Sequence, residues 1–154
     1  MKKHSIVAVM MFLLFFLVSC SPSITVSTNK KCNPRVTILK GVNFDTAKAT
    51  LKAKSYQVLD KNIMTMKSNP NITVTIVGHT DSNGADEDNQ KLSEDRANTV
   101  MQYFAKKGIA EDRMRAIGKG ETVPIADNRT ARGRAQNRRI ELEFADPDPT
   151  IICK

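Results

Sequence analysis

An arginine stands on the apolar side of a predicted helix in this sequence. Leu92, Arg96, Val100 and Tyr103 recur at spacings of four, four and three, which puts them on one face of a helix. A guanidinium on an inward face needs a carboxylate or a ligand, because an isolated charge taken out of water costs several kcal/mol. The spacing therefore predicts a partner for Arg96.

Asp81 is the candidate partner. It follows the β-branched run 72–77, which predicts a central strand, so it lies at the carboxyl end of that strand, where ligands usually bind in sheets layered with helices. If the next helix begins near Asn89, Arg96 lies about 10 Å into it. One anion beside one fork-shaped cation suits a zwitterionic ligand. A purely structural ion pair between Asp81 and Arg96 is the alternative.

Other chemistries fit the same segment less well. His79 has no serine or cysteine nucleophile that can be placed beside it, so we interpret it as a hydrogen-bonded scaffold residue. A calcium loop beginning at Asp81 would need an oxygen ligand at Ala85, glycine at Asp86 and glutamate at Leu92, and none of these is present. We predict no catalytic residue, no metal site and no cofactor.

The elements that would position Asp81 and Arg96 follow from hydrophobic periodicity and turn residues. With 154 residues, one ordinary domain is expected. The predicted strands are pieces within 36–44, then 72–77, 114–117 and 139–144; the predicted helices are 47–68, 89–107, ended by Gly108, and 130–137. This β-α-β-α-β-α-β order predicts an α+β fold, a two-layer sandwich with helices packed on a mixed four-stranded sheet.

The first nineteen residues have the pattern of a secretion signal. Lys2 and Lys3 precede an apolar run of thirteen residues, about 20 Å of helix, which is short of the roughly 30 Å hydrocarbon layer. The run ends in a segment, 17–20, that resembles a bacterial lipobox, so we expect Cys20 to be lipidated and to become the mature N-terminus. Ser21 then implies sorting to the outer membrane. An ordinary signal with an incidental cysteine is the alternative.

Two further cysteines bracket the patterned region. We interpret residues 20–35 as a lipidated tether, 36–145 as the folded domain and 146–154 as a C-terminal tail. In an oxidising periplasm, Cys32 and Cys153 would form a disulfide. Closing a loop of about 120 residues contributes up to about 4–5 kcal/mol in the chain-entropy model. Free or metal-bound thiols are the alternative.

Many motif residues occur together in register with one known family. They are Gly78-His79-Thr80-Asp81, Gly84, Asn89, Leu92-Ser93, Arg96-Ala97, Gly118, Gly120, Pro124, Asn128, Thr130, Gly133-Arg134 and Asn137-Arg138-Arg139. Over about residues 40–144 the chain resembles the OmpA-like peptidoglycan-binding domain. With the lipobox before it, the whole chain is similar to the peptidoglycan-associated lipoproteins.

This resemblance implies non-covalent binding of peptidoglycan through the diaminopimelate of its stem peptide. Asp81 would take the ligand's ammonium and Arg96 its carboxylate, with Asn89 and Arg138 lining the pocket. Thr80 and Asn83 complete the predicted ligand-binding set, which therefore comprises Thr80, Asp81, Asn83, Asn89, Arg96 and Arg138. The family often has asparagine where this chain has Ala47, so the resemblance implies one side-chain contact to the ligand fewer here.

The resemblance also bears on location and partners. It implies a lipid-anchored outer-membrane protein whose domain faces the periplasm, and leaves open whether the chain joins a Tol-type complex. The alternatives are a structural partner in a trans-envelope complex with weak or no wall binding, and an enzyme acting on the wall.

Charge alone would permit another partner. Removing Lys2 and Lys3 with the signal lowers the formal charge from +8 to +6, and residues 128–139 hold five arginines. Such a run suggests nucleic acid. The export signal, the 5% aromatic content and the resemblance, which gives Arg134 a scaffold role and Arg138 a pocket role, argue against it.

Overall fold

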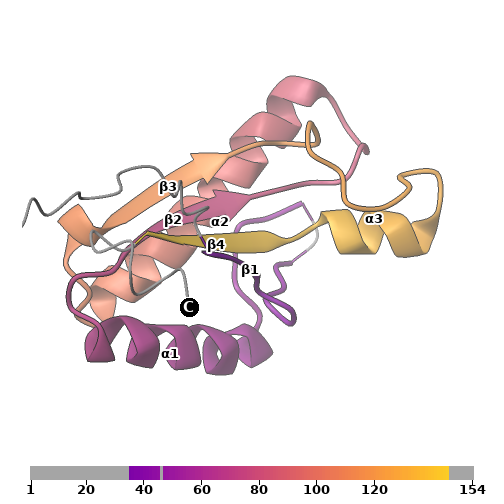
Figure 1. Ribbon diagram of the computed structural model, residues 1–154. Coiled ribbons are helices and arrows are strands. Elements are labelled where there is room, and N and C mark those ends of the chain that lie inside the picture. The colour runs from indigo at the N-terminus through magenta and orange to yellow at the C-terminus, as the bar shows by residue number, and fades with distance from the viewer. Residues whose placement is uncertain (1–34, 46, 146–154) are drawn as a thin grey trace, which may run out of the picture. The chain divides into compact units, whose positions relative to one another are not determined.

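Strands and helices alternate along the part of the chain that the computed structural model describes, residues 35–45 and 47–145. The elements are β1 (Arg35–Ile38), α1 (Ala53–Ser68), β2 (Thr73–Gly78), α2 (Asp86–Lys106), the 3-10 turn η1 (Glu111–Arg113), β3 (Met114–Gly118), α3 (Ala131–Asn137) and β4 (Ile140–Ala145) (Figure 1). The predicted order is confirmed. The predictions for the signal, the tether, the tail, Cys20, Cys32 and Cys153 lie outside the described residues.

The four strands form one mixed sheet in the order β1-β4-β2-β3. β2 is parallel to β3 and antiparallel to β4, and β1 is antiparallel to β4. The parallel pair arises because α2 carries the chain back across the sheet between β2 and β3. β2 is therefore an inner strand, as its continuous β-branched sequence predicts.

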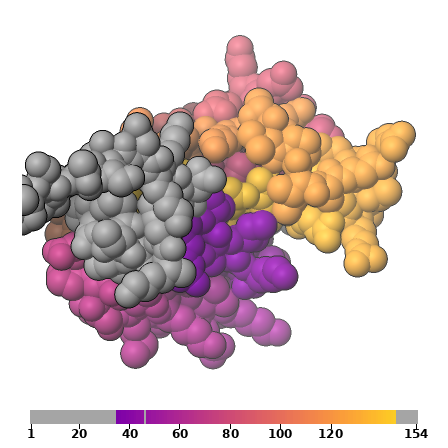
Figure 2. Space-filling view, viewed as in Figure 1, coloured from indigo at the N-terminus to yellow at the C-terminus, as the bar shows by residue number. Residues whose placement is uncertain are grey.

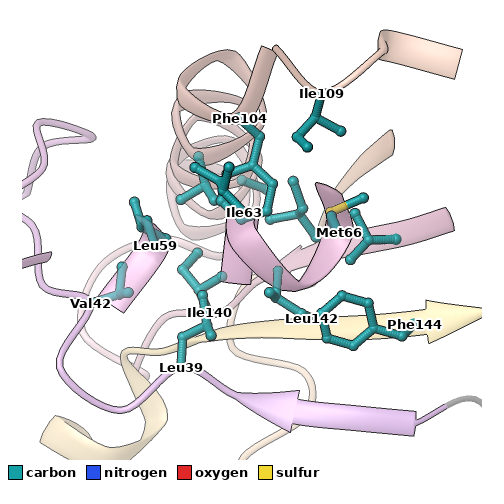
Figure 3. Close-up of a cluster of buried hydrophobic side chains, with 14 of the residues drawn as sticks. Leu39, Val42, Leu59, Ile63, Met66, Phe104, Ile109, Ile140, Leu142 and Phe144 are labelled. Atoms are coloured by element: carbon teal, nitrogen blue, oxygen red, sulfur yellow. The ribbon is translucent and has the colours of Figure 1, made fainter. Parts of the chain in front are cut away.

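The core lies between one face of this sheet and the helices α1 and α2. Alternate residues of the inner strands point to that face because successive side chains of a strand face opposite sides. Figure 3 shows the side chains of both helices meeting those of β4. The buried members are Leu59, Ile63 and Met66 of α1, Ala97, Val100 and Phe104 of α2, Val74 and Ile76 of β2, and Ile140, Leu142 and Phe144 of β4. Full burial of one such large side chain contributes about 1.5–3 kcal/mol.

The first and last strands of the described chain lie side by side. Arg35 pairs with Phe144 and Ile38 with Glu141. In Figure 2 the indigo surface of the earliest described residues accordingly adjoins the yellow surface of the latest ones. The two ends of the domain are thus joined by a strand pair.

The start of α1 differs from the sequence prediction. The periodicity predicted a helix from 47, but α1 begins at Ala53. Ala47 has a left-handed backbone, with φ of 52°, and Lys52 is extended, so neither continues a right-handed helix. Leu51, which we had placed on the helix, instead forms a bridge with Phe44.

β1 ends at Ile38, and of the second strand piece predicted within 36–44 only the bridge at Phe44 is present. The elements after α1 agree with the predictions to within three residues. α2 begins at Asp86 rather than Asn89, which puts three acidic residues in its first turn, where the helix dipole favours negative charge. Gly108 follows α2 with φ of 90°, the left-handed conformation expected of a C-terminal glycine. Within the described ranges, no helix combines the length and the apolar content needed to span a membrane.

Candidate functional site

A cleft of about 940 Å³ opens beyond the carboxyl end of β2. Four segments far apart in the sequence line it: the loop before α1 and the first residues of that helix, the exit of β2, one side of α2, and the end of α3. The lining residues are 42–45, 47 and 52–54, then 79–81 and 83, then 89, 92 and 96, and finally 135, 138 and 139. Figure 1 shows α3 beyond this end of the strands.

The structure brings together every side chain that the sequence assigned to ligand binding. Thr80, Asp81, Asn83, Asn89, Arg96 and Arg138 all line this one cleft. They come from the exit of β2, from α2 and from the residue after α3. The cleft therefore forms only when the whole described domain is folded.

Asp81 is held in place by two hydrogen bonds. Its side chain is buried, with 6% of its surface exposed. One carboxylate oxygen, Oδ2, accepts from Arg138 at 2.5 Å, and the other, Oδ1, accepts from the backbone N–H of Asn83 at 3.0 Å. An ionised carboxylate can accept about four hydrogen bonds. Asp81 thus keeps acceptor capacity for a cationic ligand.

Arg96 is buried and donates one side-chain hydrogen bond within the described residues. It is 6% exposed, its Nε donates to the carbonyl of Lys48 at 3.1 Å, and its guanidinium lies 5.0 Å from the ring centre of Phe44. Within the described residues, its two terminal nitrogens donate no hydrogen bond. The edge of the guanidinium that forms bidentate hydrogen bonds with carboxylates is therefore available to a ligand.

The electrostatics of Arg96 also favour an anion. Burial, and then the positive charge of Arg138, lower the pKa of Arg96, and the charge of Asp81 only partly offsets them. The guanidinium stays charged because its normal pKa is so high. A ligand carboxylate would supply the negative charge that the cleft lacks at this point.

Asp81 and Arg96 do not form the structural ion pair that we considered as an alternative. Among the described residues the salt-bridge partner of Asp81 is Arg138, 57 positions later in the chain. Both groups face the same cleft without neutralising each other. Periodicity could not have found the pairing with Arg138, because it joins the exit of β2 to the end of α3; only the family resemblance pointed to that arginine.

Two glycines bring α2 close enough to place Arg96 beside Asp81. A Cβ at Gly78 would lie 2.0 Å from the carbonyl oxygen of Ser93, and a Cβ at Gly118 would lie 2.5 Å from the side-chain Oγ of Ser93. The Ser93 hydroxyl in turn accepts from the backbone N–H of Gly120 at 2.9 Å. α2 therefore rests directly on the ends of β2 and β3, one turn before Arg96.

Asn89 shapes the loop between β2 and α2. Its Nδ2 donates to the carbonyl of Asn83 at 3.1 Å and to the Glu121 carboxylate at 2.6 Å. These bonds fix the backbone that in turn donates to Asp81. Asn89 lines the cleft and also supports its wall.

Some arginines of the stretch 128–139 make contacts within the domain rather than with the cleft. Arg134 donates to the carbonyl of Asn128 at 2.8 Å, which is the scaffold role expected of it. Arg129 pairs with Asp127 on the surface at 2.9 Å. The hydroxyl of Thr130 caps α3 by accepting from Gly133 at 2.9 Å. α3 is thus a short, capped element that delivers Arg138 to the cleft.

His79 is buried, but it lacks the hydrogen bonds that we predicted. Within the described residues its ring nitrogens have no partner, because the nearest Glu141 oxygen lies 3.6 Å away and the other Glu141 oxygen accepts from Arg139 at 2.6 Å. Burial, and then the charge of Arg139, lower the pKa of His79 to about 4, while Glu141 opposes the shift. His79 is therefore neutral at pH 7 and does not serve as a cationic ligand group.

The chain matches known proteins over the region that carries this cleft. The family model described as the OmpA family matches residues 43–138. Outer membrane porin F of Pseudomonas aeruginosa is 47% identical over 66% of this chain and 29% of its own length. The Escherichia coli protein named "Probable lipoprotein YiaD" is 41% identical over 68% of this chain and 48% of its own length.

A solved structure shares the fold. The crystal structure of the peptidoglycan-associated lipoprotein from Burkholderia pseudomallei aligns with a TM-score of 0.62 and 27% identity, covering 72% of this chain and 90% of that one. The chain spans only 29% to 52% of the length of the first curated relatives it matches. The similarity therefore concerns the cleft-bearing domain.

Proposed function

Because this chain belongs to the OmpA family, we propose that it binds peptidoglycan non-covalently through the diaminopimelate residue of the stem peptide. The observation that carries the proposal is the pair Asp81 and Arg96, two buried opposite charges that face one cleft and are not bonded to each other. A solved structure of similar fold is named a peptidoglycan-associated lipoprotein, which supports the proposal.

The chemistry of the two groups matches one end of diaminopimelate. The ligand's ammonium would donate to the free acceptor positions of Asp81, which Arg138 and the Asn83 backbone hold in orientation. Its carboxylate would accept from the two terminal nitrogens of Arg96. Both contacts are charge-assisted, and burial of Asp81 and Arg96 strengthens them.

The proposal is tested by co-sedimentation with purified peptidoglycan. We expect the wild-type chain to sediment with the wall without releasing soluble fragments, and Asp81→Ala and Arg96→Ala to remain in the supernatant. Asp127→Ala and Arg129→Ala are matched controls, because they remove an exposed aspartate–arginine pair that does not line the cleft. Thermal unfolding checks that each variant is folded.

The results separate the competing functions. Wall binding retained by both cleft variants would exclude this cleft as the binding site. A folded wild-type chain that does not sediment would favour a structural partner of an envelope complex. Release of soluble wall fragments by the wild type would instead indicate an enzyme.

The same proposal places the domain on a lipid anchor at Cys20 in the outer membrane, facing the periplasm. Support comes from the lipobox-like residues 17–20 and from the similarity to a protein named as a lipoprotein. Cys20→Ala should abolish incorporation of labelled palmitate and leave an unlipidated precursor. Palmitate incorporation that is unchanged in this variant would refute the anchor.

A further inference from the structure

We propose that the cleft contains a second carboxylate subsite at the N-terminus of α1, formed by Lys52 and Lys54, so that the chain prefers an acidic wall peptide to its amidated form. This inference rests on the proposed function, since it concerns the peptide residue next to the diaminopimelate. It concerns a segment that the sequence assigned to no role.

The cleft carries more positive than negative charge. Its basic lining residues are Lys52, Lys54, Arg96, Arg138 and Arg139, and its acidic ones are Asp45 and Asp81. Arg139 is neutralised by Glu141, behind the cleft. The ammonium and carboxylate at one end of diaminopimelate cancel each other, so this end alone leaves the excess uncompensated. A further anionic group on the ligand would reduce this excess.

The N-terminus of α1 is prepared for an anion. α1 has 16 residues, its N-cap Lys52 makes no capping hydrogen bond, and its first turn has no acidic residue. Within the described residues, the backbone N–H groups of Ala53 and Lys54 have no acceptor. Such free N–H groups, with the positive end of the helix dipole, attract carboxylates.

The two lysines reinforce this helix end. Both are exposed and line the cleft, and no carboxylate of the described residues lies within 4.0 Å of either ammonium. α2 shows the opposite arrangement, since Asp86, Glu87 and Asp88 fill its first turn. Of these two helix N-termini, only that of α1 lacks its own negative charge.

Two independent observations, the volume of the cleft and a buried hydroxyl without a partner among the described residues, point to a ligand in it. The cleft volume of about 940 Å³ lies near the upper end of the roughly 300–1,000 Å³ range of ligand pockets. Thr80 lines it, is only 4% exposed, and its hydroxyl has no hydrogen-bond partner among the described residues. A buried hydroxyl without a hydrogen-bond partner costs free energy unless a ligand bonds to it.

The test compares two synthetic peptides by calorimetric titration at low salt. One is L-Ala-γ-D-Glu-diaminopimelate-D-Ala, in which the γ-linkage leaves the glutamate α-carboxylate free; the other carries an amide there. We expect the wild-type chain to bind the acid form about five- to tenfold more tightly, the range of a helix-end and exposed-charge interaction. The double variant Lys52→Gln/Lys54→Gln should lose most of this preference, because only the backbone N–H groups of the helix end then remain to attract the carboxylate.

Lys61→Gln/Lys67→Gln is the matched control, because it removes two exposed lysines of α1 that do not line the cleft. This variant should keep the preference. Equal wild-type affinity for the two peptides, or an undiminished preference in the Lys52→Gln/Lys54→Gln variant, would overturn the subsite while leaving the diaminopimelate site intact. Failure of both peptides to bind would overturn the proposed function, and the subsite with it.

Discussion

Single residues set the charge balance of the cleft. Arg96 is a buried cation whose terminal nitrogens are unoccupied among the described residues, whereas Asp81 is an anion already oriented by Arg138. Breaking a buried, hydrogen-bonded charge interaction usually costs more free energy than breaking an exposed ion pair. Arg138 should therefore contribute to binding by positioning Asp81, and the loss on its removal should be smaller than on removal of Asp81 itself.

His79 makes the stability of the domain depend on pH. Its pKa of about 4 in the folded chain lies below the ordinary value of 6.5, so between these values the unfolded chain binds the proton and the folded chain does not. Stability should fall as the pH is lowered through this window, by about 2–3 kcal/mol between pH 7 and pH 4.5. His79→Gln should lose correspondingly less over the same interval in urea unfolding. Equal losses for the wild type and the variant would show that His79 is not the group responsible.

The sequence identified the individual site residues better than their contacts. Arg96 could be found from its position on an apolar helical face, and Asp81 from its place after a strand. The bond between Asp81 and Arg138 could not, because it depends on where α3 lies in space. The missing hydrogen bond of His79 was equally hidden, since Arg139 binds one oxygen of Glu141 and the other lies 3.6 Å from the His79 ring.

At the scale of elements, the contact of α2 with the ends of β2 and β3 positions the site. Asp81 follows Gly78 by three residues and Arg96 follows Ser93 by three, so the close approach of Gly78 to Ser93 fixes the distance between the two charges. Packed backbones transmit small displacements because protein interiors have little free space.

Gly78→Ala tests this coupling between packing and function. The new methyl group would meet a backbone carbonyl at 2.0 Å, so α2 must move away from the sheet. We expect a loss of about 2 kcal/mol or more in the free energy of unfolding and weaker wall binding by the chain that remains folded. An unchanged melting temperature together with unchanged co-sedimentation would contradict this role for the glycine.

Long periodic elements were predictable and the loop before α1 was not. The sequence of β2 corresponds to a buried strand, and of the stripe predicted for α2 Arg96 and Val100 are buried while Leu92 and Tyr103 are half-buried. The pattern placed Leu51 on α1, whereas the left-handed Ala47 and the extended Lys52 turn this segment into a small bridged loop. That loop supplies one wall of the cleft, including the carbonyl of Lys48 that accepts from Arg96.

At the scale of the whole molecule, the pairing of β1 with β4 supports the proposed disulfide. Cys32 precedes Arg35 by three residues and Cys153 follows Phe144 by nine, and Arg35 and Phe144 are strand partners. Nine residues can span about 30 Å, more than enough to return to the start of β1. The proposed bond would close the loop that contains the entire described domain.

This bond predicts a measurable dependence on reduction. The chain purified from an oxidising compartment should show no free thiol at Cys32 or Cys153 and should unfold at a lower temperature after reduction. The variant Cys32→Ser/Cys153→Ser should match the reduced wild type, because the chain-entropy term, at most about 4–5 kcal/mol, is lost in both. Two reactive thiols in the untreated chain would exclude the disulfide.

The central claim is that Asp81 and Arg96 bind the two charges of one diaminopimelate end. The most direct measurement is a titration of the isotope-labelled domain with free diaminopimelate, followed by NMR chemical shifts. Saturable shifts should appear at the Arg96 side-chain Nε and at the backbone amides of Asp81 and Asn83, and the shifts of these two amides should vanish in Arg96→Ala. Shifts confined to other surfaces, or unchanged in that variant, would contradict it.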